Sequence, residues 1–144
     1  MKGPKAMARY VCILASSFAL IVLSACQVAP ATPGEPLTGS WGGRHVALEL
    51  GRDGGTLEYD CAAGTIDEPV RPDSLGRFSV SGTHTPGHGG PERVGEEVPV
   101  LPANYEGRIT GSRITLSVRV LPSGLDLGPF TLRRDEAPVI TRCL

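Results

Sequence analysis

"RITLSVRV" (residues 113–120) is the segment with the clearest secondary-structure pattern in the chain. Its aliphatic side chains fall on alternate positions, and polar or charged side chains fall on the positions between them. Successive side chains of a strand point to opposite faces, so this segment has one apolar face and one polar face. The pattern predicts a half-buried antiparallel strand, with Leu116 facing a core and Thr115 facing solvent.

The surrounding sequence predicts further short strands joined by tight turns. "NYEGRIT" (104–110) alternates in the same way, and Gly111-Ser112 between the two segments suits a type II′ hairpin turn. The fold class we predict is all-β: an antiparallel meander of about seven or eight short strands, closed as a small barrel or as a sandwich. The other expected strands are "HVALEL" (45–50), "GTLEYD" (55–60), "GRFSVSG" (76–82), "GPFTLRR" (128–134) and "PVITRC" (138–143), with a hairpin loop at "RDGG" (52–55).

The same alternation predicts the core. Its inward positions carry mostly large side chains, which favours a filled barrel over one that encloses a ligand cavity. We expect Trp41, the single tryptophan, to close one end. Residues 83–102 are polar and rich in glycine and proline, and they predict a long loop without strands, where binding sites often lie. The expected inward residues are Val46, Leu48, Phe78, Val80, Ile109, Ile114, Leu116, Val118, Phe130 and Leu132.

The N-terminus has the features of an export signal. Lys2, Lys5 and Arg9 precede a mostly apolar run at 10–23, which is too short for a comfortable membrane span and typical of a signal peptide. "LSAC" (23–26) then resembles the lipobox of bacterial lipoproteins. The resemblance implies that residues 1–25 are a lipoprotein signal peptide and that Cys26 receives a thioether-linked diacylglycerol. The alternative is a plain secretory signal whose cleavage site happens to precede a cysteine.

The charge of the remaining chain limits its partners. Without residues 1–25, it has 11 basic and 15 acidic residues, a net charge of −4. A mildly acidic domain without a basic patch argues against nucleic-acid binding. This charge also gives no reason to expect attraction to an anionic membrane surface. We therefore expect attachment to a membrane only through the lipid at Cys26, where two or three acyl chains hold far better than one. In Gram-negative lipoproteins, an aspartate after the lipidated cysteine favours retention in the inner membrane. Gln27 stands at that position here, so the resemblance implies the outer membrane if the organism is Gram-negative.

The segment after Cys26 predicts a linker and then one folded domain. Residues 26–38 contain three prolines and lack an apolar face, so we expect a semi-rigid, extended tether. We place the folded β domain at 39–144. Its only thiols are Cys61 and Cys143. Since export delivers them to an oxidising compartment, we expect a disulfide between them.

The remaining polar residues give weak signals for chemistry. His84 and His88 stand four apart, as metal ligands do on a helix, but Pro86 and Gly87 exclude a helix there. We therefore expect a solvated loop and no metal site, and His45 stands elsewhere. The acids are scattered through strand ends and turns, so we expect no enzyme and no cofactor. These acids are Asp53, Asp60, Asp67, Glu68 and Asp73.

Three further resemblances concern the domain. Gly39-Ser40-Trp41 is similar to the G-x-W motif of the first lipocalin strand, which implies a tryptophan at the barrel floor with Arg133 or Arg134 across it; a plain core tryptophan is the alternative. "LEYDCAAG" (57–64) with Cys143 is similar to periplasmic inhibitors of C-type lysozyme. "SWGGRHVALEL" (40–50), together with "YEGRITG" and "LGPFTL", resembles a family of small uncharacterised bacterial envelope proteins.

We thus expect a lipid-anchored protein of the bacterial cell envelope with a non-catalytic binding or structural β domain. Its partners would be the membrane, through the lipid on Cys26, and an unidentified envelope protein. Two alternatives stay open: a lipocalin-like carrier of a small apolar ligand, and an inhibitor of an envelope-directed enzyme. A cavity in the barrel would favour the carrier.

Overall fold

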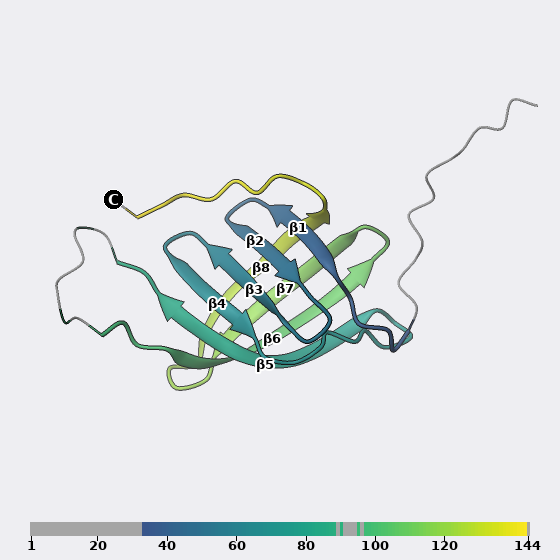
Figure 1. The fold of residues 1–144 in the computed structure, drawn as a ribbon, viewed down its shortest axis with the longest axis horizontal. Coiled ribbons are helices and arrows are strands. Elements are labelled where there is room, and N and C mark those ends of the chain that lie inside the picture. The colour runs from purple at the N-terminus through teal and green to yellow at the C-terminus, as the bar shows by residue number, and fades with distance from the viewer. Residues whose placement is uncertain (1–32, 89, 91–94, 96, 144) are drawn as a thin grey trace, which may run out of the picture.

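The predicted all-β fold is confirmed, and it is a barrel rather than a sandwich. The computed structural model describes residues 33–88, 90, 95 and 97–143. Neighbouring strands pair antiparallel in chain order, and β8 pairs with β1 to close the ring (Figure 1). Within the described ranges, no helix is long and apolar enough to cross a membrane. The eight strands are β1 (Gly39–Gly43), β2 (Val46–Leu50), β3 (Gly55–Tyr59), β4 (Ala62–Ile66), β5 (Arg77–Pro86), β6 (Leu101–Thr110), β7 (Arg113–Val120) and β8 (Leu125–Arg134).

The strand predicted from "RITLSVRV" is β7, with the predicted faces buried and exposed. Along β7, buried and exposed residues alternate without a break. The turn between β6 and β7 is Gly111-Ser112, and Gly111 has a φ of 59°, the positive value that the first central residue of a type II′ turn requires. All the expected inward residues are buried except Phe130, which is half-buried and packs against the core.

Three expectations about the strands are wrong in detail. Neither β1 nor "AAGTI", which forms β4, was among the expected strands, and the small residues of "AAGTI" give a weak pattern. The tail segment "PVITRC" is not a strand but makes one isolated bridge, between Val139 and Arg44. The loop expected at 83–102 is shorter, because β5 continues to Pro86 and β6 begins at Leu101. Pro86 is the last residue of β5, and proline is tolerated at the end of a strand better than in its interior.

The two ends of the barrel differ. We call the end that contains Trp41 the closed end and the opposite end the mouth. The mouth is bounded by the β1–β2, β3–β4 and β7–β8 turns and by the end of β5 and the start of β6. In Figure 1 the C-terminal tail ends at the left, whereas the chain enters β1 from the right.

The folded part begins before residue 39. Leu37 is only 3% exposed, and its N–H donates to the carbonyl of Val70 at 2.8 Å. The end of the segment expected to be tether therefore packs at the closed end, because one apolar side chain in a proline-rich stretch suffices to dock it. Cys26 and the rest of residues 1–32 lie outside the described residues.

Candidate functional site

The barrel is filled from the closed end to its middle and is hollow at the mouth. Here a cavity of about 320 Å³, the mouth pocket, opens between the strand ends. Small-molecule sites have volumes of roughly 300–1,000 Å³. The mouth pocket is therefore at the small end of this range. It is lined by His45, Tyr59, Asp60, Cys61, Ala62, His84, Pro86, Leu127 and Phe130.

A β-bulge in β8 supplies two of the apolar walls. Leu116 on β7 faces Phe130, but Val118, two residues further along, faces Leu127. The extra residue on β8 lets both Leu127 and Phe130 turn toward the interior, since bulges re-aim side chains. Sequence alternation predicted Phe130 but missed Leu127 because a regular strand would point the two residues to opposite faces.

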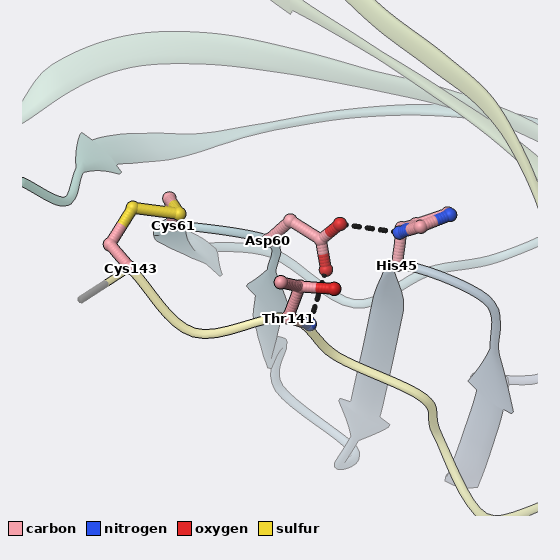
Figure 2. Close-up of a disulfide and its surroundings, with 5 residues drawn as sticks. All are labelled: His45, Asp60, Cys61, Thr141 and Cys143. Atoms are coloured by element: carbon pink, nitrogen blue, oxygen red, sulfur yellow. Dashed lines mark hydrogen bonds and ion pairs between the residues drawn. A yellow bond between two sulfur atoms is a disulfide. The ribbon is translucent and has the colours of Figure 1, made fainter. Parts of the chain in front are cut away.

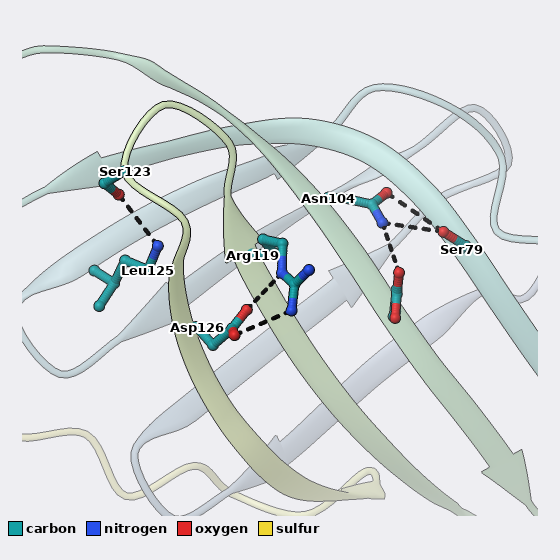
Figure 3. Close-up of polar contacts among 7 residues, drawn as sticks. Ser79, Asn104, Arg119, Ser123, Leu125 and Asp126 are labelled. Carbon is teal, nitrogen blue, oxygen red and sulfur yellow. Dashed lines mark hydrogen bonds and ion pairs between the residues drawn. The ribbon is translucent and has the colours of Figure 1, made fainter.

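An ion pair on the outer surface holds β8 beside this bulge. Arg119 donates two hydrogen bonds to the carboxylate of Asp126, at 2.8 and 3.1 Å, directly before Leu127 (Figure 3). The bond from Arg119 lowers the pKa of Asp126 from its ordinary value, so this carboxylate stays ionised. Figure 3 also shows Asn104 bonded to Ser79 across β5 and β6. These outer contacts are structural.

Tyr59, which lines the mouth pocket, is hydrogen-bonded to the fully buried Tyr105. The hydroxyl of Tyr105 donates to the carbonyl of Thr83 at 2.6 Å, and the hydroxyls of Tyr105 and Tyr59 lie 2.7 Å apart. A hydroxyl has a single hydrogen to donate, so Tyr59 must donate to Tyr105. Burial raises the pKa of both hydroxyls. Gly64 makes room for the pair, because a Cβ there would collide with both tyrosine oxygens.

His84 is the main correction to the sequence analysis. We expected it in a solvated loop, but it lies on β5, is only 5% exposed and lines the mouth pocket. Its ring centroid is 5.8 Å from that of Tyr59, and no group in the described part of the chain forms a hydrogen bond with its buried Nδ1. Burial lowers the pKa of the imidazole, which favours the neutral ring. His84 lies on the same face of β5 as Phe78 and Val80, because all three have even numbers. The sequence analysis ended this strand at Gly82, so it did not assign His84 to that face.

The C-terminal tail ties down one side of the mouth (Figure 2). Cys143 is joined to Cys61 by the expected disulfide, with Cα atoms 5.1 Å apart. Asp60 accepts a hydrogen bond from the N–H of Thr141 at 2.7 Å and pairs with Nδ1 of His45. The bond from Thr141 is the largest cause that lowers the pKa of Asp60.

This tail also explains two unusual turn conformations. His45 and Cys61 have φ values of 69° and 57°, although neither is a glycine. Such conformations cost about 1–3 kcal/mol each and persist where the surroundings enforce them. Here the N–H of His45 donates to the carbonyl of Val139 at 2.7 Å, and Cys61 carries the disulfide. The tail therefore fixes both turns that frame the pocket.

The other candidate residues do not converge on the mouth pocket. His88 is exposed, and Asp53, Asp67, Glu68 and Asp73 lie in turns at the closed end, where the last two accept backbone hydrogen bonds. Among the described residues, no three His, Cys, Asp or Glu side chains are grouped as a metal site would need.

The arrangement at the mouth is suited to binding. Aromatic and aliphatic walls surround one buried imidazole, as in pockets that hold small molecules and orient them with a few polar groups. No family model, curated protein or solved structure matches the chain in the comparisons made.

Proposed function

We propose that the chain is a lipid-anchored protein of the bacterial cell envelope, and that its barrel is a non-catalytic module that binds a small, largely apolar ligand at the mouth. Two independent parts of the chain support this proposal. The first is the sequence before and at Cys26, and the second is the mouth pocket. The alternative of an enzyme inhibitor stays a prediction.

Export and anchoring are supported by the N-terminal sequence and by the cysteines of the barrel. The apolar run at 10–23 followed by "LSAC" is typical of a lipoprotein signal. A disulfide between Cys61 and Cys143 fits a protein that resides in an oxidising compartment. Diacylglycerol on Cys26 would then hold the protein on the membrane.

The observation that carries the binding function is where the barrel is empty. Large side chains fill the closed end and the middle; Trp41, Leu48 and Leu116 are each almost fully buried. At the mouth, by contrast, aromatic walls surround an open cavity.

The position of the tether gives the site an orientation. The chain reaches β1 at the closed end, next to Leu37 and Val70. A lipid on Cys26 would therefore hold the closed end toward the membrane, and the mouth would face away from it. In that orientation the ligand enters from the aqueous side.

Ligand extraction from protein made in a bacterial envelope tests the proposal. The mature chain, residues 26–144 with Cys26→Ser, is exported behind an ordinary secretory signal, so that no detergent competes for the pocket. Ala62→Leu fills the pocket wall, and Ala63→Leu adds the same atoms at the exposed next residue. We expect mass spectrometry of solvent extracts to find a compound with the parent and with Ala63→Leu that is depleted with Ala62→Leu. Identical extracts from all three would refute the binding function.

A further inference from the structure

The polar groups of the mouth pocket differ in their spare hydrogen-bonding capacity. The hydroxyl hydrogens of Tyr59 and Tyr105 are both used, within the chain that ends at the carbonyl of Thr83. The carboxylate of Asp60 is occupied by Thr141 and His45. His84 remains: its ring lines the pocket, and among the residues that the structure describes its buried Nδ1 has no hydrogen-bond partner. The imidazole is thus the polar group on which a ligand can be oriented.

The charge around the pocket excludes one large class of ligands. Burial lowers the pKa of the His84 imidazole and favours the neutral ring, so the described residues place no cation in the interior of the pocket. At the rim, Asp60 is a carboxylate and pairs with His45. Burying an unpaired anion is costly, so a carboxylate or phosphate ligand would be disfavoured here.

The size and shape of the pocket narrow the choice further. About 320 Å³ is too small for a long acyl chain, which would have to project far out of the mouth. The rings of Tyr59 and Phe130 stack with their planes 26° apart and their centroids 5.8 Å apart. Aromatic pairs favour such offset arrangements. The pocket lining thus offers aromatic faces against which the ring of a ligand can pack.

We propose that the mouth pocket binds a small, neutral aromatic molecule that carries a hydroxyl group, a phenol in chemical class, and that the hydroxyl pairs with the imidazole of His84. A hydroxyl both donates and accepts, so it can pair with either tautomer of the neutral ring. This inference rests on the proposed binding function and names the chemistry of its ligand.

Three matched probes test it by calorimetry on the mature Cys26→Ser chain. They are para-cresol, toluene, which lacks the hydroxyl, and benzoate, which is a charged ring. A hydrogen bond contributes a net 0.5–1.5 kcal/mol, roughly a 2- to 12-fold change in affinity. We therefore expect saturable binding of para-cresol, roughly 5-fold weaker binding of toluene and no saturable binding of benzoate.

Variants then show whether His84 is responsible. His84→Phe keeps a ring but removes the nitrogens. It should lower the affinity for para-cresol to that for toluene and leave the affinity for toluene unchanged. Ala62→Leu should lower the affinity for both probes. Ser81→Ala, at an exposed position of the same strand, is the control and should change neither. If His84→Phe does not fold, NMR of the parent replaces it: para-cresol should shift the imidazole resonances of His84, and toluene should not.

Several outcomes would overturn the inference. The first is equal affinity for para-cresol and toluene, and the second is tighter binding of benzoate than of para-cresol. The others are no saturable binding of any probe, and equal shifts of the His84 imidazole resonances with para-cresol and toluene. The proposed function is judged separately by the extraction experiment. The extracted compound could be depleted by Ala62→Leu and yet be charged or be an acyl chain. That result would contradict a phenol as the ligand and would leave the proposed binding function intact.

Discussion

The guanidinium carbon of Arg134 lies 4.4 Å from the centroid of the Trp41 ring. The two residues are partners in the register of β1 and β8, where the barrel closes. Arg134 also donates to the carbonyl of Thr38 at 3.2 Å, and so binds the entering chain to the last strand. The G-x-W resemblance implied Arg133 or Arg134 across this tryptophan. Arg134 takes that place, while Arg133 lies 3.6 Å from Glu136.

Removing this guanidinium should loosen the closed end. Cation–π contacts contribute about 0.5–2 kcal/mol, and the stem of an arginine adds packing of its own. We expect Arg134→Ala to lower the free energy of unfolding by about 1–2 kcal/mol and to change the fluorescence of Trp41. Arg133→Ala is the matched control and should have a smaller effect on both. Equal effects of the two variants would show that Arg134 does not close the barrel.

The interior of β7 should respond differently from its exterior. Leu116 is fully buried, and Leu→Ala in a core costs about 2–5 kcal/mol. For a domain of this size, that corresponds to a drop in melting temperature of about 10 °C or more. Thr115→Ala and Ser117→Ala alter exposed neighbours and should change it little. The strand assignment fails if the three variants melt together.

These assignments show what alternation can predict. Along β7 the period of two is complete, because one side of the strand meets the core and the other meets water. In β4, the inward residues include Gly64, whose space is taken by the hydroxyls of Tyr105 and Tyr59. A partner on another strand thus fills the position, and no pattern within β4 records it.

The mouth pocket was hidden from the sequence for a related reason. His84 stands in "GTHTPGHGG", whose glycines and proline indicate a loop, but pairing with β6 keeps the segment extended. Leu127 faces inward only because of the bulge opposite β7. Both facts depend on a neighbouring strand. The pairing of Cys61 with Cys143, by contrast, could be predicted from the number of cysteines in the domain and the expectation of export.

The disulfide should be present in the native protein and should stabilise it. It closes a loop of 82 residues, for which the chain-entropy model gives on the order of 4 kcal/mol. Mass tagging of thiols in the non-reduced mature Cys26→Ser chain should find no free thiol, and Cys143→Ser should lower the melting temperature. Two free thiols in protein isolated from the envelope would contradict the assignment.

Cys26 should carry the lipid. In cells that express the full chain, Cys26→Ala should abolish labelling by palmitate and leave an unprocessed precursor. The reason is that the diacylglycerol would be attached to the sulfur of the Cys26 thiol. Cys61→Ala serves as the control, since it removes another thiol without touching "LSAC". Unchanged labelling of Cys26→Ala would falsify the lipoprotein assignment and leave the fold and the mouth pocket untouched.

The attachment of the tail to the mouth should depend on pH through Asp60. Its carboxylate accepts the N–H of Thr141, and this bond lowers the pKa of Asp60 below its ordinary value of 3.8. A carboxyl whose pKa is lower in the folded state stabilises it above the unfolded pKa and loses that effect as the pH falls through the folded pKa. The melting temperature of the parent should therefore exceed that of Asp60→Asn near neutral pH, and the difference should shrink below about pH 4. Asp53→Asn, in the β2–β3 turn at the closed end, controls for the loss of one negative charge. A difference between parent and Asp60→Asn that stays constant from neutral to acidic pH would mean that the ionised carboxylate does not hold Thr141, and that the disulfide and the backbone bonds of Val139 hold the tail without it.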